Sequence, residues 1–463
     1  LSLQSTADLL STTQNRLATG NKVNSALDNP TNFFTAQGLN NRAGDINNLL
    51  DSIGNGVQVL QAANTGITSL QKLVDTAKSI ANQALQATSG YSTKSQATTT
   101  IAGATANNLL PPDTAATLTG ATTGTIAAAS ALTGATGGSF VAGDTIIVNG
   151  TTIKVTAAGA GTAASTTDPD GTINLNTTAT TAATTTDLTN AIKTALGGGS
   201  ASAAIASNAV TITAGNTSDS ITLGGTALAK VGLTAGVTAP TSTKAGQQLT
   251  IGAIDGSASQ TITFGTGAGQ VSTLDDLNTK LAASNLTASI DTTGKLTLTT
   301  TNDEASVNLA SSLFTGSGVG AGMLFGTIAT SNAVADVNAQ NTRGTLISQF
   351  NAVIDQIRTT AQDSSFNGVN LLNGDQLKLV FNETGKSTLT IQGVTFDPAG
   401  LGLASLVKGT DFLDNASTNK VLDSLNNASG TLRSQASTFG SNLSIVQIRQ
   451  DFSKNLINVL QTG

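Results

Sequence analysis

Apolar residues return at every seventh position over two long stretches, one toward each end of the chain. The first series consists of Ile46, Ile53, Leu60, Ile67 and Val74. The second series includes Leu425, Leu432, Phe439 and Val446. A second apolar row runs beside each series, and two such rows form the a/d seam of a coiled coil. At the rise of an α-helix, residues 46–84 would span about 60 Å, a length suited to a helical bundle.

Two shorter helical patterns precede these series. They are Leu3, Leu10 and Leu17 in the first case, and Leu346, Phe350, Val353 and Ile357 in the second. Gly20 and Pro30 lie between the first two helical stretches, where they act as stop and restart signals. We expect the stripes to pack against one another inside the chain, so the terminal segments must meet. Residues 1–90 and 330–463 are therefore predicted to form a coiled-coil-like helical rod, with the middle of the chain as an insertion.

The middle of the chain alternates apolar and polar residues with the period of a β-strand. Strands are predicted at 145–148, 209–213, 260–264 and 295–299. The region also repeats: Ile221 corresponds to Val307 and Val210 to Leu296 at the same separation, with a short helix before each pair. We expect two copies of a strand-strand-helix-strand-strand module, at 140–239 and 240–329. Residues 91–139, rich in Ala, Thr and Gly, are predicted to be a linker or loosely ordered lead-in. The predicted fold class is α+β, in an elongated multi-domain chain.

Composition excludes several classes of function. Charged residues make up only 10% of the chain, and His and Cys are absent. A Ser-His-Asp triad, a Cys-His nucleophile, a His or thiolate zinc site and a disulfide framework are therefore excluded. A net charge of -6 offers no basic field for nucleic acid. No apolar run reaches the roughly 20 residues of a membrane-spanning helix, so we expect neither nucleic acid nor membrane as a partner.

The remaining polar motifs favour structural roles. Asp168, Asp170 and Gly171 resemble the middle of a calcium loop, but Thr166 and Thr177 stand where that loop needs Asp and Glu. A Pro-Asp-Gly β-turn explains the same residues. Other candidates are the acidic pairs 275–276 and 303–304, of which the first is better placed to cap a helix. The glycine-rich runs at 265–269 and 316–322 lack the spacing of a phosphate loop. We expect no cofactor, no metal and no enzymatic activity.

Two further segments carry a family resemblance. The first runs from residue 16 to residue 30 and contains Arg16, Leu17, Gly20, Asn24, Ser25 and Asp28. The second contains Phe366, Asn367, Gly368, Leu371 and Leu372. In this order they resemble the two signatures of bacterial flagellins. The terminal heptad stretches are similar to the same family, whereas the central repeats resemble its inserted modules by pattern alone.

The resemblance implies a structural subunit of the bacterial flagellar filament, extracellular and used for motility. It implies a β-hairpin near 366–396, helices packed toward the filament interior, an outward insertion, and a switching contact at 378–394. Its partners would be further copies of the chain, an export chaperone and the export apparatus, and hook-associated proteins. Because family members continue beyond both ends of this chain, we expect terminal assembly helices to be missing and the fragment to be monomeric.

Two other interpretations stay open. A hook–filament junction or cap protein also joins helical ends to such modules. A cell-surface adhesin or polysaccharide-binding protein could use the outer modules, although sugar sites favour aromatic platforms and the chain has one Tyr and no Trp.

Overall fold

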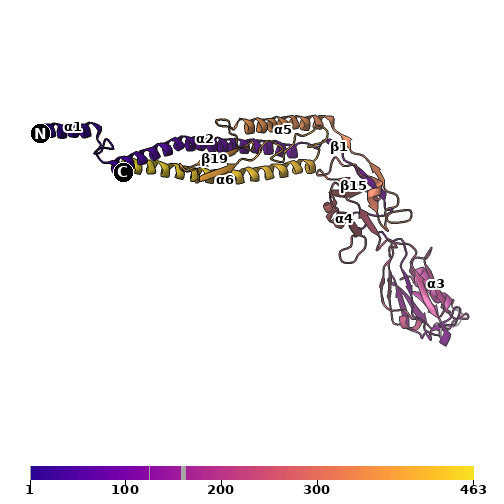
Figure 1. Ribbon diagram of the computed structural model, residues 1–463. Helices are drawn as coiled ribbons and strands as arrows, with labels where there is room; N and C mark the ends of the chain where they lie inside the picture. Colours follow the sequence, from indigo (N-terminus) through magenta and orange to yellow (C-terminus); the bar gives the residue numbers. More distant parts are fainter. Residues whose placement is uncertain (1, 125, 158–162) are drawn as a thin grey trace. The chain divides into compact units, whose positions relative to one another are not determined.

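The computed structural model describes residues 2–124, 126–157 and 163–463, which form long helices and many short strands (Figure 1). The chain has a mixed α+β fold, as the sequence predicts. It divides into two units. The helical unit contains Leu1–Lys94, Asn302–Ser306 and Ala333–Gly463. The inserted unit contains Ser95–Thr301 and Val307–Asn332.

Four α-helices build the described part of the helical unit. They are α1 (Ser2–Thr19), α2 (Pro30–Gln86), α5 (Val337–Asp363) and α6 (Asn415–Thr462). Helix α2 begins where the Asn29 side chain accepts a hydrogen bond from the Asn32 amide and Pro30 occupies the first helical position. Helices α5 and α6 both lie along α2 (Figure 1). Ile46, near the start of α2, packs with Ile457 and Leu460 near the end of α6, so these two helices are antiparallel.

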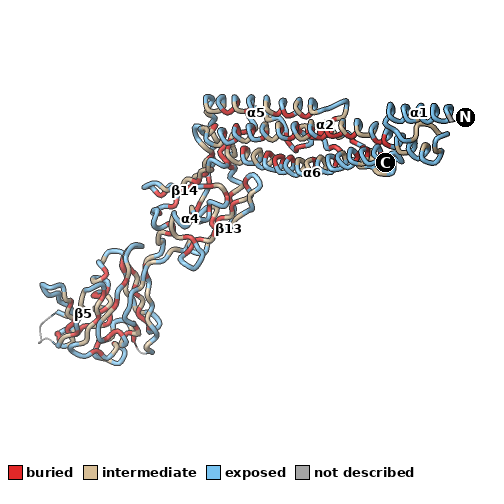
Figure 2. Tube along the Cα trace, turned by 90° about the vertical axis from the view of Figure 1, so that its left-hand side faces the viewer, coloured by how far each residue is buried: buried red, intermediate tan, exposed pale blue. Residues whose placement is uncertain are grey.

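The core of the helical unit is the set of apolar stripes that these helices turn toward one another (Figure 2). On α5 the large apolar residues buried in this core are Ile347, Phe350, Ile354 and Ile357, with Leu346 and Val353 partly buried beside them. The sequence places the α5 stripe on Leu346, Phe350, Val353 and Ile357, so the face is slightly rotated from the prediction. Each large apolar side chain buried in this way contributes about 1.5–3 kcal/mol.

Two β-ladders complete the helical unit. One is a hairpin of β19 (Gln376–Val380) and β20 (Thr388–Gln392), in which Leu379 lies opposite Leu389. Its Leu377, Leu379 and Ile391 join the core against α2. The other ladder pairs β1 (Tyr91–Thr93) with β18 (Val334–Ala335), where the chain leaves and returns to the helical unit.

The described residues of the inserted unit form two separate hydrophobic cores. The first core lies among a six-stranded sheet, a three-stranded sheet and α3 (Thr185–Ala195). The six-stranded sheet has the order β11 (Gly236–Thr238), β10 (Ile221–Gly224), β4 (Thr145–Val148), β5 (Thr151–Thr156), β7 (Ile173–Asn176), β6 (Ser165–Thr167). Its β5–β7 pair is parallel. The three-stranded sheet has the order β3 (Thr117–Thr119), β9 (Ala209–Thr213), β8 (Ser202–Ala206).

The second core lies among two further sheets and α4 (Leu274–Leu281). One sheet has the order β13 (Gln260–Thr263), β12 (Gln248–Ile251), β16 (Phe314–Thr315). The other has the order β14 (Leu286–Ile290), β15 (Lys295–Thr300), β2 (Gln96–Thr100), β17 (Ala329–Ser331). Short 3-10 helices occur at Ala135–Gly137, Leu228–Val231, Ala282–Ser284 and Ser311–Leu313. Helices α3 and α4 both begin with capping boxes, formed by Thr184 with Asp187 in α3 and by Thr273 with Asp276 in α4.

The predictions for residues 91–139 and 306–309 differ from the structure. Residues 91–139 contain β1, β2 and β3 rather than only a linker, and Leu109 is fully buried. Strand β2 escapes detection because four of its five residues are Thr or Gln, and its two buried residues, Ala97 and Thr99, include a single apolar one. Residues 306–309, expected to be the last strand of the second repeat, form no strand. There the Leu309 amide donates to Ser95 Oγ at 2.8 Å.

Candidate assembly surface

The predicted helix seams are buried in the interior of the helical unit. Ile46 is 2% exposed and the other members of both series are fully buried. Those others are Ile53, Leu60, Ile67, Val74, Leu425, Leu432, Phe439 and Val446. Because the two helices bury these residues against each other, the seams leave no face of their own for another molecule.

A second apolar stripe lies on α6 and faces outward. It consists of Ile445, Ile448, Phe452 and Val459, which are 45%, 69%, 59% and 66% exposed. Three of them stand one residue before a seam position, which rotates them by about 100° to the flank of the seam. Apolar residues clustered on a surface mark a site of association. This stripe was not predicted from the sequence, although its seven-residue spacing at 445, 452 and 459 is a visible signal.

Helix α1 presents a further exposed apolar surface. Leu3, Leu9, Leu10 and Leu17 are all at least 60% exposed. The expectation that the short seam of α1 packs inside the chain is therefore wrong for the described residues. A seam of single leucines becomes buried only against a partner helix, and no described segment covers this one.

The first signature segment forms the turn between α1 and α2. Arg16 and Leu17 are exposed in the last turn of α1, and Gly20 follows in the left-handed region at φ +70°. Asp28 accepts hydrogen bonds from the amides of Asn24 (3.1 Å) and Ser25 (3.0 Å). These backbone bonds lower the pKa of Asp28 from its usual value. The signature residues thus fix the local backbone of an exposed turn.

The second signature segment is a tight turn that leads into the hairpin. Phe366 and Val369 exchange backbone hydrogen bonds across Asn367 and Gly368, which both have positive φ. Phe366 is 37% exposed, and Asn367 and Gly368 are exposed. Immediately afterwards Leu371 and Leu372 are fully buried in the core of the helical unit. The segment therefore combines an exposed turn with a buried anchor.

The anchor is reinforced by one buried amide. The Asn370 side chain donates to the carbonyls of Ala361 (2.8 Å) and Gln362 (2.9 Å) at the end of α5. Its oxygen accepts from the Leu372 amide at 2.9 Å. These bonds tie the start of the hairpin segment to the end of α5.

Two arginines hold the far tip of the hairpin. Arg42 of α2 pairs with Glu383 at 2.7 Å. Arg449 of α6 lies over the ring of Phe381 at 5.5 Å from its centroid. Next to the hairpin, a groove of about 280 Å³ runs between α2 and β19 and includes Asn367 of the signature turn. The hairpin is thus fixed to both long helices of the unit, while Thr388, Thr390 and Gln392 of β20 stay exposed.

Arg343 is a buried charged residue that no sequence pattern singled out. It lies in α5, is 2% exposed, and donates to the carbonyls of Thr88 (2.8 Å), Ala87 (2.9 Å) and Phe412 (2.5 Å). Burial lowers its pKa, and the nearby Asp414 carboxylate acts in the opposite direction. Arg343 therefore satisfies carbonyls that the end of α2 leaves without helical partners.

The acidic motifs considered as calcium or acid–base sites form a turn and a helix cap. Asp168 and Gly171 close a β-turn between β6 and β7 through a 2.9 Å backbone bond. Asp276 caps α4, where hydrogen bonds from Thr273 and Ser272 lower its pKa. In the described part of the chain no three acidic side chains gather where they could hold a metal ion.

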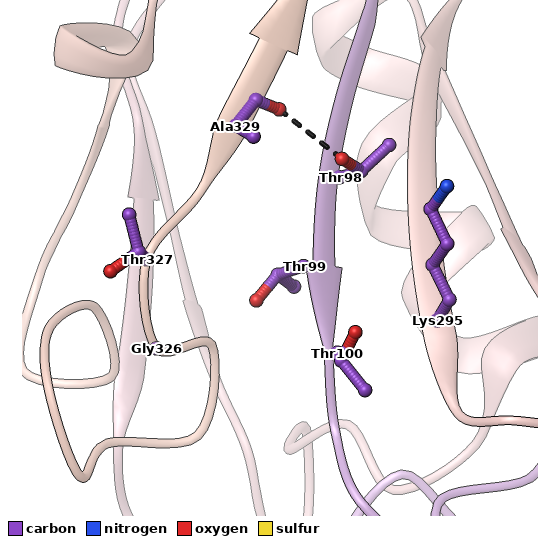
Figure 3. Close-up of a pocket in the computed structure, with 7 residues that line it drawn as sticks. All are labelled: Thr98, Thr99, Thr100, Lys295, Gly326, Thr327 and Ala329. Carbon is purple, nitrogen blue, oxygen red and sulfur yellow. Dashed lines mark hydrogen bonds between the residues drawn. The ribbon is translucent and has the colours of Figure 1, made fainter.

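A pocket of about 380 Å³ opens on the sheet of β2, β15 and β17 (Figure 3). Its lining consists of Thr98, Thr99, Thr100, Lys295, Gly326, Thr327 and Ala329. Thr98 already donates to the Ala329 carbonyl at 3.5 Å. The lining contains neither a carboxylate nor an aromatic ring, so it offers no acid–base pair and no stacking platform.

None of the described helices is long and apolar enough to cross a membrane.

The chain was compared with known proteins and with protein-family models. A search of curated proteins found no match for the chain. Residues 1–108 match the family model described as the bacterial flagellin N-terminal helical region.

Proposed function

We propose that this chain, which is a bacterial flagellin, serves motility as the structural subunit of the flagellar filament. The match over residues 1–108 carries the proposal, since it covers α1, the signature turn and all of α2. Flagellins are structural proteins that assemble into an extracellular filament, and catalysis is no part of that role. The exposed apolar stripes add physical support, because exposed apolar patches on a protein surface mark sites of association with other molecules.

The parts of the chain would then divide the work. Residues 1–90 and 330–463, with the hairpin near 366–396, would form the inner rod. The modules at 140–239 and 240–329 would form the outward insertion, with residues 91–139 leading into them. Their exposed strand faces are rich in Thr, as in the Thr117–Thr213 and Thr250–Thr261 hydroxyl pairs, and suit contact with water.

The subunit contacts would use the apolar surface that the chain leaves uncovered. On this proposal the stripe Ile445, Ile448, Phe452 and Val459 and the leucines of α1 meet neighbouring copies. The signature residues Arg16, Leu17, Gly20, Asn24, Ser25 and Asp28 would set the direction in which α1 leaves α2. Phe366, Asn367 and Gly368 would lie at a contact near the hairpin, with Leu371 and Leu372 as its anchor. Further partners would be an export chaperone, the export apparatus and hook-associated proteins.

Immuno-electron microscopy tests the proposal directly. Antibodies raised against the purified chain are applied to cells of the bacterium that produces it, with a strain lacking the gene as control. Gold along the whole filament is the expected result. A single cluster at the filament base or tip would favour a junction or cap protein, and label on the cell body would favour an adhesin.

A further inference from the structure

The first turn of α6 is capped by a segment that is remote in sequence. The amides of Asn415 and Ala416 donate to the carbonyls of Asn302 (3.2 Å) and Asp303 (3.0 Å). The first amides of an α-helix have no partner inside the helix and must be satisfied by other groups. Most helices use a side chain within a few residues for this purpose. Here two backbone carbonyls, more than one hundred positions earlier in the chain, take that role.

The side chains of the two segments reinforce this cap. Asp414 is 4% exposed and accepts from the Ser417 amide at 2.9 Å, as an ordinary N-cap does. Its other oxygen accepts from the Ser306 amide (3.3 Å) and hydroxyl (2.5 Å). Asp303 in turn accepts from the Asn415 side chain at 3.1 Å. Both sides of the contact therefore supply donors and acceptors.

Apolar and polar burial surrounds the contact. Ala305 is fully buried and Glu304 is 3% exposed. On the other side of Asp414, the carbonyl of Phe412 accepts from Arg343, whose other donors hold the end of α2. Phe412 is itself fully buried and meets the Phe350 ring edge to face at 5.9 Å. The end of α2, the body of α5 and the start of α6 are thus joined at this one place.

The capping segment lies in the chain between two parts of the inserted unit. Residues 302–306 belong to the helical unit, but strand β15 ends at Thr300 immediately before them and the inserted unit resumes at Val307. The five residues therefore contact α6, while the chain on either side of them, at Thr301 and Val307, belongs to the inserted unit.

We infer that residues 302–306 act as a latch through which the folded state of the inserted unit stabilises the start of α6. When β15 opens, the latch loses its fixed end and the amides of Asn415 and Ala416 lose their acceptors. The long helix then frays from its first turn, next to the place where Arg343 joins the helices. The inference concerns stability within one chain and stands whether or not the proposed function does.

Hydrogen exchange of the whole chain, measured by mass spectrometry under native conditions, tests the latch. Leu298→Ala removes a core side chain of β15 that is 3% exposed, which should raise exchange in β15 by at least about 30-fold. Under the latch, exchange at residues 415–417 rises by the same factor, while residues 430–440 of α6 keep their protection. Equal factors are the signature of one shared opening event.

Two further variants make the result decisive. Leu188→Ala creates a similar cavity in the other core of the inserted unit, where Leu188 is 1% exposed, and should leave residues 415–417 unchanged. Ser306→Ala removes the hydroxyl bond to Asp414 and should raise exchange at 415–417 by about tenfold without affecting β15. If Leu298→Ala does not fold, the milder Leu298→Val takes its place, with the same comparison of β15 and residues 415–417. Unchanged exchange at 415–417 in Ser306→Ala, or in a folded Leu298→Ala, would overturn the inference.

Discussion

Substituting each of two phenylalanines on α6 distinguishes the packing of this helix in the core from its proposed contact with other molecules. Phe439 is fully buried in the core of the helical unit, whereas Phe452, less than four turns later, is 59% exposed. Replacing a buried phenylalanine by alanine costs about 3–5 kcal/mol, the sum of lost transfer energy and the cavity left behind. Typical domains have a free energy of unfolding of about 5–15 kcal/mol. Phe439→Ala should therefore remove a large part of the stability of the helical unit, and Phe452→Ala should change it by less than about 0.5 kcal/mol.

Urea unfolding followed by circular dichroism at 222 nm measures both variants. The signal reports mainly on the helical unit, since α2, α5 and α6 have 57, 27 and 48 residues while α3 and α4 have 11 and 8. A loss of less than about 1 kcal/mol in Phe439→Ala would refute the assignment of the seam to the core. A loss above about 2 kcal/mol in Phe452→Ala would show that the outer stripe is needed for folding, and not kept for association.

Three further predictions concern single contacts in the helical unit. Arg343→Met leaves three carbonyls without their donor and should cost about 3–5 kcal/mol, with Arg343→Lys intermediate, by the same urea assay; equal stability of all three proteins would contradict it. Gly393→Ala would place a Cβ 2.6 Å from the Leu371 carbonyl and should cost about 1–3 kcal/mol. Its control, Gly430→Ala in α6, meets no atom within 4 Å and should stabilise by about 0.5–1 kcal/mol. Because the pKa of Asp28 is lowered in the folded chain, its carboxylate stabilises the signature turn fully above pH 3.8 and loses that effect as the pH falls through the folded pKa. An NMR titration that gives Asp28 a pKa at or above 3.8 would reject this account.

The parts of the fold that are predictable from sequence are those with long or regular patterns. The heptad series predicts α2 and α6, because many successive turns repeat the same apolar spacing. Gly20 and Pro30 mark the break between α1 and α2 to within a residue of where the structure has it. The strands at 145–148 and 295–299 follow from their alternation, which the structure reproduces in β4 and β15.

The remaining features depend on contacts that no local pattern encodes. Arg343 is an ordinary polar residue in a helix until the fold brings the Ala87 and Phe412 carbonyls to it. Residues 306–309 match the strand Ile221–Gly224 of the first repeat. In the structure, however, Ser306 donates a hydrogen bond to Asp414 before the start of α6, and residues 306–309 form no strand. The outer stripe of α6 was readable as a heptad, but only the packing tells which of two adjacent series is buried.

The short ladder of β1 and β18 sets the conditions under which this protein can exchange its middle for another sequence. Tyr91 lies opposite Ala335, and paired residues in an antiparallel ladder have their Cα atoms only about 4.5–5.5 Å apart. A donor domain whose own ends lie together could be grafted between them with little entropic cost, since closing a longer loop adds only about 0.6 kcal/mol per doubling of its length. Such a graft would still have to offer two carbonyls to Asn415 and Ala416, or the recipient helix would begin with bare amides.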